Sequence, residues 1–234
     1  MPTYARIHQL NTSLIYHIYS RSNGKIPIFK SREDFIYFKS LLKRYSLRFD
    51  LKIYHWVIMS NHYHLLFELE QPKRISKIMA GLSKAYSCYY HKTYFTAGFL
   101  WQGRFKLQPV QKDSYLITCG RYIERNPVRA GMVNEAYEYP YSSAGYYCLG
   151  ENNEITTENP IFISFGIDLV NRRNAYIEFL RKFDDEEQRL FNNLEHPVGN
   201  REFLKRLVRE NGRFTSMRRG RLKKELLHKT LIGI

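Results

Sequence analysis

A tight turn between two strand-like segments constrains the fold of this chain more than any other feature. The segments LKIYHWVIMS (51–60) and YHLLFELE (63–70) are rich in β-branched and aromatic residues, as strands are. Almost no residues separate them, so they predict an antiparallel hairpin with its turn near Ser60–Asn61. Any fold proposed for the chain must therefore place these two strands side by side.

The segments that flank the hairpin alternate between strand-like and helix-like patterns. In chain order they predict a strand, a helix, a second helix after the hairpin, a further strand and a third helix, over residues 13–21, 31–49, 74–94, 104–111 and 113–126. Ser31 and Asp113 stand where helix N-caps are expected, and Pro127 predicts the end of the third helix. Pro109 has no N–H to donate to a neighbouring strand, so its strand is expected at a sheet edge.

The predicted order is β-α-β-β-α-β-α, and its first six elements follow the ferredoxin-like, or split βαβ, arrangement. The predicted fold class is therefore α+β, with an antiparallel sheet and helices on one face. In this topology the first and third strands are central. His62 and His64 then lie at the turn and at the start of a central strand.

Length and charge predict one main domain with an extension. The chain has 234 residues and a net charge of +15. Basic and acidic residues number 21 and 9 in residues 1–150, 5 and 10 in 151–200, and 11 and 3 in 201–234, which gives +12, −5 and +8. We expect a basic domain over 1–150 and a helical extension over 151–234, with helices at 169–183 and 200–212 and a basic DNA-binding tail.

The composition favours a polyanionic partner. A basic chain with 19 Tyr and 15 Phe suits nucleic acid with unpaired bases, although a basic domain without a specific partner would have a similar composition. The three cysteines are scattered and lack zinc-binding spacing. No apolar N-terminal segment or membrane-spanning run is present in the sequence, so we expect a cytoplasmic, nucleoid-associated protein without a membrane partner.

Two histidines follow the hairpin turn, one residue apart. Side chains two residues apart on a strand point to the same face, so His62 and His64 face together. On the third predicted helix, Tyr122 and Asn126 are four residues apart and share a face. If that helix packs on the sheet, two imidazole nitrogens and an amide oxygen form an open three-ligand site that suits Mn²⁺ and can accept Mg²⁺. Tyr122 then stands one turn from a ligand, in the position of a nucleophile for a phosphodiester.

Packing is the alternative for each of these residues. Histidines on strands are more often structural than metal-binding, and a helical tyrosine usually packs. His17 and His55 also lie on predicted strands, where packing or surface roles are expected. The pair His62 and His64 differs because it lies near the end of an element, where solvent can reach.

Four sequence motifs, NHYH, LLFELE, WQGRFK and YIERNPVRAG, occur in an order that resembles the single-tyrosine HUH transposases. More closely, the chain resembles the REP-associated tyrosine transposases among the IS200-like transposases. HUH denotes His, a hydrophobic residue and His, which is His62-Tyr63-His64 here. The resemblance covers roughly residues 10–150. Ser60 stands where many relatives have proline, and this departure leaves every ligand in place.

The resemblance implies a metal-dependent endonuclease and strand transferase with the HUH nuclease fold over residues 1–150. His62 and His64 would bind Mg²⁺ or Mn²⁺ with Asn126 as the third ligand, and Tyr122 would attack single-stranded DNA. The products are a 5′-phosphotyrosine link and a free 3′-OH, which can reverse the step during DNA transposition or recombination. The family's substrates are hairpins of repetitive extragenic palindromes (REP elements), and the REP-associated branch is expected to act as a monomer.

Further basic and aromatic residues are expected to contact DNA. The candidates near the site are Trp101, Arg104, Lys106, Arg121, Arg125 and Arg129. The first three suit a groove for single-stranded DNA, although sheet packing would explain part of their pattern, and the arginines that flank the tyrosine can hold phosphates. The tail segment RRGRLKKE resembles the basic end of some relatives, with a solvated basic tail as the alternative, and its candidates are Arg218, Arg219, Arg221, Lys223 and Lys224.

Two other classes of protein share these features. A domesticated DNA-binding protein would keep the sheet and lose cleavage, although the complete set of His62, His64, Tyr122 and Asn126 argues against it. An RRM-like RNA-binding module has the same topology and uses aromatic residues of its sheet, but it needs no histidine pair facing a tyrosine helix.

Overall fold

The predicted hairpin is present in the computed structural model, which describes residues 10, 14–182, 185–192, 194 and 196–211. Strands β2 (Lys52–Ile58) and β3 (His62–Glu68) pair antiparallel. The Met59 N–H donates to the His62 carbonyl at 2.8 Å, which closes the turn around Ser60 and Asn61. The hairpin prediction is therefore confirmed.

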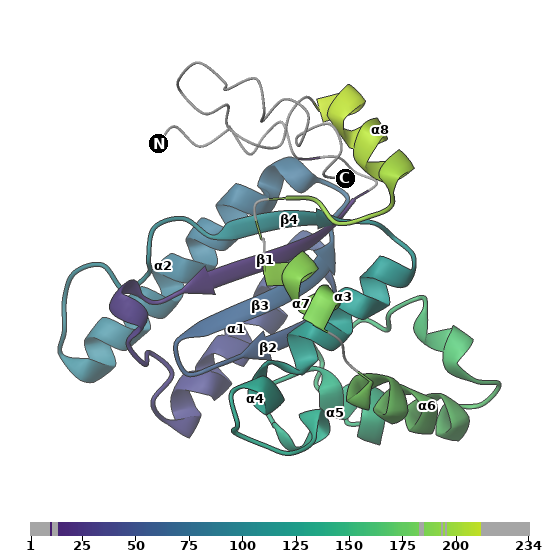
Figure 1. The fold of residues 1–234 in the computed structure, drawn as a ribbon. Coiled ribbons are helices and arrows are strands. Elements are labelled where there is room, and N and C mark those ends of the chain that lie inside the picture. Colours follow the sequence, from purple (N-terminus) through teal and green to yellow (C-terminus); the bar gives the residue numbers. More distant parts are fainter. Residues whose placement is uncertain (1–9, 11–13, 183–184, 193, 195, 212–234) are drawn as a thin grey trace.

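The sheet has four antiparallel strands in the order β2-β3-β1-β4, with β1 at Ile15–Arg21 and β4 at Lys106–Val110. The central strands are β1 and β3, as the ferredoxin-like topology predicts (Figure 1). The strand that contains Pro109 is at the edge, where its missing N–H costs no sheet hydrogen bond. The predicted fold class, α+β with an antiparallel sheet, is confirmed.

The two crossover helices, α1 (Arg32–Phe49) and α2 (Ile75–Tyr94), lie on one face of the sheet (Figure 1). Helix α1 begins with a capping box formed by Ser31 and Asp34. The core on this face joins aromatic and aliphatic side chains of the strands and both helices, among them Ile18, Tyr63, Phe67, Phe38, Leu42, Ile78 and Leu82.

The opposite face of the sheet is covered by α3 (Ser114–Glu124) and α7 (Asp185–Asn192), which Figure 1 shows in front of the strands. The prediction that the helices lie on one face was therefore wrong, because this face also carries apolar side chains that helices must bury. The Asp113 side chain caps α3 by accepting from the Tyr115 N–H at 3.1 Å. Helix α3 ends at Glu124, and the short α4 (Asn126–Arg129) contains Pro127. The core of this face is built from Ile15, Val57, Leu66, Leu116, Ile123 and Phe191.

The chain beyond the sheet continues with α5 (Ala144–Leu149), α6 (Leu169–Arg181) and α8 (Arg201–Asn211). Short 3₁₀ turns among the described residues span Asn23–Lys25, Pro72–Arg74, Ala136–Glu138 and Phe162–Phe165. The predicted helices at 169–183 and 200–212 correspond to α6 and α8. Phe203 and Leu207 of α8 are buried against the α1 and α2 core. Within the described parts of the chain, no helix has the length and apolar character that crossing a membrane requires.

Candidate active site

A buried hydrogen-bond network holds α3 against β2. His55 Nδ1 lies 2.8 Å from Glu124 Oε1, and the Tyr176 hydroxyl donates to Glu124 Oε2 at 2.7 Å. These three side chains are fully buried. Gly120 allows the close approach, because a Cβ at this position would lie 2.5 Å from His55 Nε2. The network therefore sets the position of Tyr122, which precedes Glu124 by two residues, over the sheet.

The structure brings the four predicted site residues to one place on the sheet. The Tyr122 ring lies 5.8 Å from the His64 ring, and the His62 and His64 rings are 5.3 Å apart. The Asn126 side chain lies close enough to His62 to raise the pKa of that imidazole. Helix α3 thus presents the tyrosine to the histidines at the start of central strand β3.

The N–H groups of His62 and Asn126 are occupied by hydrogen bonds to other parts of the chain. Asn61 donates from Nδ2 to the Lys25 carbonyl at 2.8 Å, so its Oδ1, 2.6 Å from His62 Nδ1, accepts the ring proton. In neutral His62, Nε2 is then an acceptor. Asn126 donates from Nδ2 to two carbonyls of α3, both at 3.0 Å, which leaves its Oδ1 for His62. Asn126 is close enough to affect the pKa of His62, and two neighbouring acceptor atoms favour a cation between them, so these residues fit a metal ion.

Among the described residues, no group of three or more His, Cys, Asp or Glu side chains is placed so that it could hold a metal ion. A metal at this site would therefore need the amide oxygen of Asn126 in addition to His62 and His64. An imidazole–imidazole–amide set suits Mn²⁺ and can accept Mg²⁺.

Burial keeps the two histidines neutral. It is the main reason that the pKa of His62 is lowered to about 4. The positive charge of Arg21 acts in the same direction, and the Asn126 side chain acts in the opposite one. Burial also lowers the pKa of His64 well below its usual value, with smaller contributions from neighbouring histidines and Arg129. Neutral imidazole is the form that binds metal ions.

The tyrosine is buried beside an arginine. Only 3% of Tyr122 is exposed, and this burial raises its pKa. Arg129 acts in the opposite direction, since a hydrogen bond and its positive charge both lower the pKa of Tyr122. The guanidinium carbon of Arg129 lies 5.2 Å from the centre of the tyrosine ring. Arg129 therefore favours the phenolate form that a nucleophile needs.

Helix α7 covers the tyrosine. The Tyr122 hydroxyl donates to Asn192 Oδ1 at 2.9 Å, and the fully buried Phe191 ring lies 5.4 Å from the Tyr122 ring. An ion pair between Arg121 and Glu187 joins α3 to α7. In this conformation α7 occupies the space next to the nucleophile candidate.

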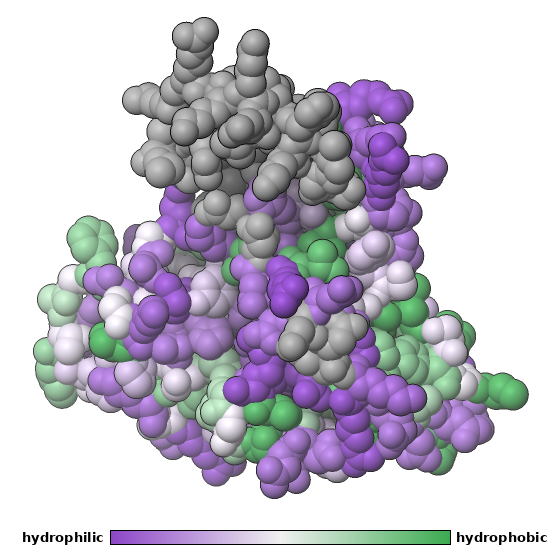
Figure 2. Space-filling model, viewed as in Figure 1, coloured by the Kyte–Doolittle hydropathy of each residue, from purple (hydrophilic) through white to green (hydrophobic). Residues whose placement is uncertain are grey.

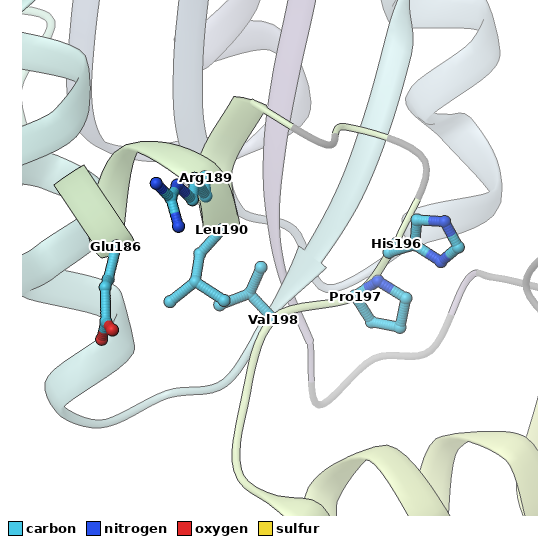
Figure 3. Close-up of a pocket in the computed structure, with 6 residues that line it drawn as sticks. All are labelled: Glu186, Arg189, Leu190, His196, Pro197 and Val198. Atoms are coloured by element: carbon cyan, nitrogen blue, oxygen red, sulfur yellow. The ribbon is translucent and has the colours of Figure 1, made fainter. Parts of the chain in front are cut away.

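A pocket opens on the other side of α7, between this helix and the segment 196–198 beside β4 (Figure 3). Its lining consists of Glu186, Arg189, Leu190, His196, Pro197 and Val198. None of these is a predicted site residue, because the space at Tyr122 itself is filled by α7. The surface over α3 and α7 is mostly hydrophilic (Figure 2).

The predicted DNA-binding residues fall into three groups in the structure. Exposed at the surface are Arg104, Lys106 and Arg129. Trp101 is half-buried against the core and donates from Nε1 to the Ser83 carbonyl at 3.1 Å. Arg121 and Arg125 donate to backbone carbonyls of α6 and Lys182. The tail candidates Arg218, Arg219, Arg221, Lys223 and Lys224 lie outside the described residues, and their DNA-binding role stays a prediction.

Two exposed aromatic residues were not identified from the sequence. Phe95 is 95% exposed and Phe99 is 91% exposed, in the connection between α2 and β4 (Figure 1). Gln102 in this connection accepts from the Arg21 guanidinium at 2.8 Å, and Arg21 pairs with His62 across the sheet. The two rings therefore belong to a connection held at the His62 end of the sheet. The sequence signal was two phenylalanines in a short segment that contains a glycine, which does not separate exposed rings from buried ones.

The fold and the site define a ferredoxin-like domain with a His-hydrophobic-His strand facing a helical tyrosine. Residues 11–126 match the family described as "Transposase IS200 like". This segment therefore belongs to the IS200-like transposases, and the family predicted from the motifs is confirmed.

Comparison with solved structures identifies a similar fold in the "Structure of the REP associates tyrosine transposase bound to a REP hairpin". The TM-score is 0.53 at 16% sequence identity, over 67% of this chain and 94% of that chain. At this identity the likeness establishes the fold. Comparison with curated proteins found no match.

Proposed function

We propose that this protein is a metal-dependent endonuclease and strand transferase that cuts single-stranded DNA next to a hairpin, with Tyr122 as the nucleophile. The observation that carries the proposal is the Tyr122 ring 5.8 Å from the His64 ring, next to the acceptor atoms of His62 and Asn126. The transposase family supports DNA as the substrate. The REP hairpin bound by the similar structure supports a palindromic hairpin.

His62, His64 and Asn126 would hold the divalent metal, Mn²⁺ or Mg²⁺. When bound, such an ion polarises the phosphodiester as a Lewis acid. The chain's own contribution is to keep both rings neutral and to turn their Nδ1 atoms toward hydrogen-bond partners, which leaves each Nε2 for the ion.

The chemical step exchanges one phosphoester bond for another. The Tyr122 hydroxyl gives up its proton, and its oxygen bonds to the phosphorus while the bond from phosphorus to the 3′-oxygen breaks. The leaving oxygen takes up a proton and becomes a free 3′-OH. Since one ester replaces another, the 5′-phosphotyrosine can be attacked by a 3′-OH without an external energy source. Arg129 stabilises negative charge at the phenol oxygen and the phosphate during this exchange.

Exposed residues near the site would bind the strand. Arg104, Lys106 and Arg129 offer positive charge to phosphates, and the rings of Phe95 and Phe99 offer stacking surfaces for unpaired bases. Tyr122 and all three ligand candidates come from one chain. This arrangement supports a monomeric enzyme, with the nuclease domain in residues 1–150 and the extension in 151–234.

A non-cleaving DNA-binding protein is the second candidate, and the burial of Tyr122 under α7 favours it. The proposed enzyme must move α7 before DNA can reach the tyrosine, whereas a binding protein need not. An RRM-like module is disfavoured, because α3 and α7 cover the sheet face opposite α1 and α2.

Covalent capture tests the proposal. The protein is mixed with single-stranded hairpin oligonucleotides and Mn²⁺ or Mg²⁺, and adducts that survive denaturation are resolved on a gel. The hairpins are taken from palindromic repeats of the source genome. The wild type should form an adduct, and Tyr122→Phe should abolish it with DNA binding nearly unchanged. Tyr115→Phe is the matched control on the same helix and should still form it. An adduct that persists in Tyr122→Phe would refute the assignment of the nucleophile.

A further inference from the structure

The buried side chain of His17, on β1, links the metal-ligand candidate His64 on β3 to Gln108 on β4. His17 on β1 is fully buried, and both its ring nitrogens are hydrogen-bonded. His17 Nε2 lies 2.8 Å from His64 Nδ1, and His17 Nδ1 lies 3.1 Å from the Oε1 of Gln108 on β4. The two rings stack with 5.1 Å between their centres. The sequence suggested only packing or a surface role for His17.

The direction of the hydrogen bonds follows from Gln108. Its Nε2 lies 3.2 Å from the Leu190 carbonyl and 2.8 Å from the His196 carbonyl. A carbonyl oxygen can only accept, so the Gln108 amide nitrogen must point toward these two groups and its oxygen toward His17. Leu190 and His196 both line the pocket of Figure 3.

The proton positions of both rings then follow in sequence. The Gln108 oxygen can only accept, so His17 carries its proton on Nδ1. In a neutral ring the other nitrogen accepts, so His17 Nε2 accepts from His64 Nδ1. His64 therefore carries its proton on Nδ1, and its Nε2 keeps the lone pair that a metal ligand needs.

We propose that His17, oriented by Gln108, is a positioning residue that holds His64 in the Nδ1–H form and so keeps His64 Nε2 available as a ligand. The proposal deepens the proposed function and rests on it for the metal at His64. The tautomer itself does not depend on a metal. The opposite tautomer would place a hydrogen on Nε2, where it would block coordination.

The relay also connects the metal ligand to the region of α7. Leu190 belongs to α7, and the next two residues, Phe191 and Asn192, contact Tyr122. One short segment therefore covers the nucleophile and supplies a carbonyl that orients Gln108 toward His17.

Two substitutions of His17 separate the relay from simple packing. His17→Leu removes the acceptor for His64. His17→Gln keeps the direction of both hydrogen bonds, because the new amide nitrogen can donate to the Gln108 oxygen while the new amide oxygen accepts from His64 Nδ1. Leu66→Ala is the matched control, since Leu66 is the fully buried cross-strand partner of His17 and takes no part in the relay.

Two measurements test the relay. Two-bond ¹H–¹⁵N spectra of metal-free protein with labelled histidines report the tautomer of His64. Calorimetric titration with Mn²⁺ reports affinity, and thermal melting confirms that each variant is folded. We expect the Nδ1–H form in the wild type. Loss of a hydrogen-bond partner behind a metal ligand typically costs 10–100-fold in affinity, so His17→Leu should weaken Mn²⁺ binding by about that factor. His17→Gln should restore most of the affinity, and Leu66→Ala should destabilise the fold without changing affinity.

An Nε2–H tautomer in the wild type would overturn the proposal, and so would His17→Leu binding Mn²⁺ as tightly as the wild type. Failure of the proposed function has a different signature. A wild type that shows the Nδ1–H form but binds no Mn²⁺ would uphold the relay and refute the metal role of His64.

Discussion

Replacement of Phe191 by alanine should speed DNA cleavage by loosening α7 over Tyr122. Tyr122 is only 3% exposed, so DNA cannot reach it until α7 moves. That movement returns the fully buried Phe191 ring to water and breaks the 2.9 Å hydrogen bond between Tyr122 and Asn192. Both interactions therefore favour the closed conformation.

The size of the effect follows from the buried ring. Full burial of a large apolar side chain contributes about 1.5–3 kcal/mol, and an ordinary hydrogen bond about 0.5–1.5 kcal/mol. Since about 1.4 kcal/mol corresponds to a factor of ten, Phe191→Ala should increase the open population about 10–100-fold while that population remains small. Asn192→Ala should increase it by a smaller factor, about 2–10-fold.

The assay is the single-turnover rate of covalent adduct formation with saturating hairpin DNA, with thermal melting as the check on folding. Leu190→Ala is a suitable control, because Leu190 lies on the same helix with 47% of its surface exposed and should change the rate little. A slower rate in a folded Phe191→Ala protein would refute the reasoning. It would mean that α7 completes the active site and does not restrict access to it.

Three further predictions concern DNA affinity and acid stability. Base stacking on an aromatic ring is worth about 1–3 kcal/mol, so Phe95→Ala with Phe99→Ala should weaken single-stranded DNA binding at least about tenfold with an unchanged melting temperature; fluorescence anisotropy measures this, and equal affinity would exclude a stacking role. Removal of residues 212–234 should reduce the slope of log affinity against log salt by about 0.7 for each phosphate contact that is lost. A higher DNA concentration should then restore cutting. Faster cutting with equal affinity would instead indicate that the tail is inhibitory. Burial lowers the pKa of His17 to about 4, below the value of about 6.5 for an unfolded histidine, so the unfolded chain binds the extra proton and stability falls as the pH drops from 6.5 toward 4. Glutamine does not titrate, so His17→Gln should reduce this fall in the free energy of unfolding by about 3 kcal/mol. Urea denaturation at several pH values measures it, and an unchanged dependence of the unfolding free energy on pH would contradict the prediction.

The truncation point depends on the structure. By charge alone the basic segment begins at residue 201, but Phe203 and Leu207 of α8 are buried in the core cluster to which α1 and α2 also contribute. A cut at that point would expose this core and confound the binding measurement. A cut after residue 211 keeps the buried side chains and removes only the part of the basic tail that lies beyond α8.

The sequence by itself determined the features that depend on neighbouring residues. The hairpin at Ser60–Asn61, the helix start at Ser31 and the edge strand with Pro109 follow from local conformational preferences. The alternation of a strand places His62 and His64 on one face, and the pitch of a helix places Tyr122 and Asn126 on another. Under the assumption that this helix packs on the sheet, the two faces meet. The candidate site could therefore be outlined from the sequence before the structure was known.

The tertiary structure decided the features that depend on residues far apart in the chain. His17 and His64 are 47 positions apart and His17 and Gln108 are 91 apart, so no local pattern indicates that these side chains bond to one another. The covering of Tyr122 by Asn192 joins residues 70 positions apart. A buried polar group must find a partner wherever the fold brings one, and that partner is set by the packing of β1, β4 and α7. Local periodicity therefore placed the ligand and nucleophile candidates, and only the packed fold determined which protons they carry and what covers them.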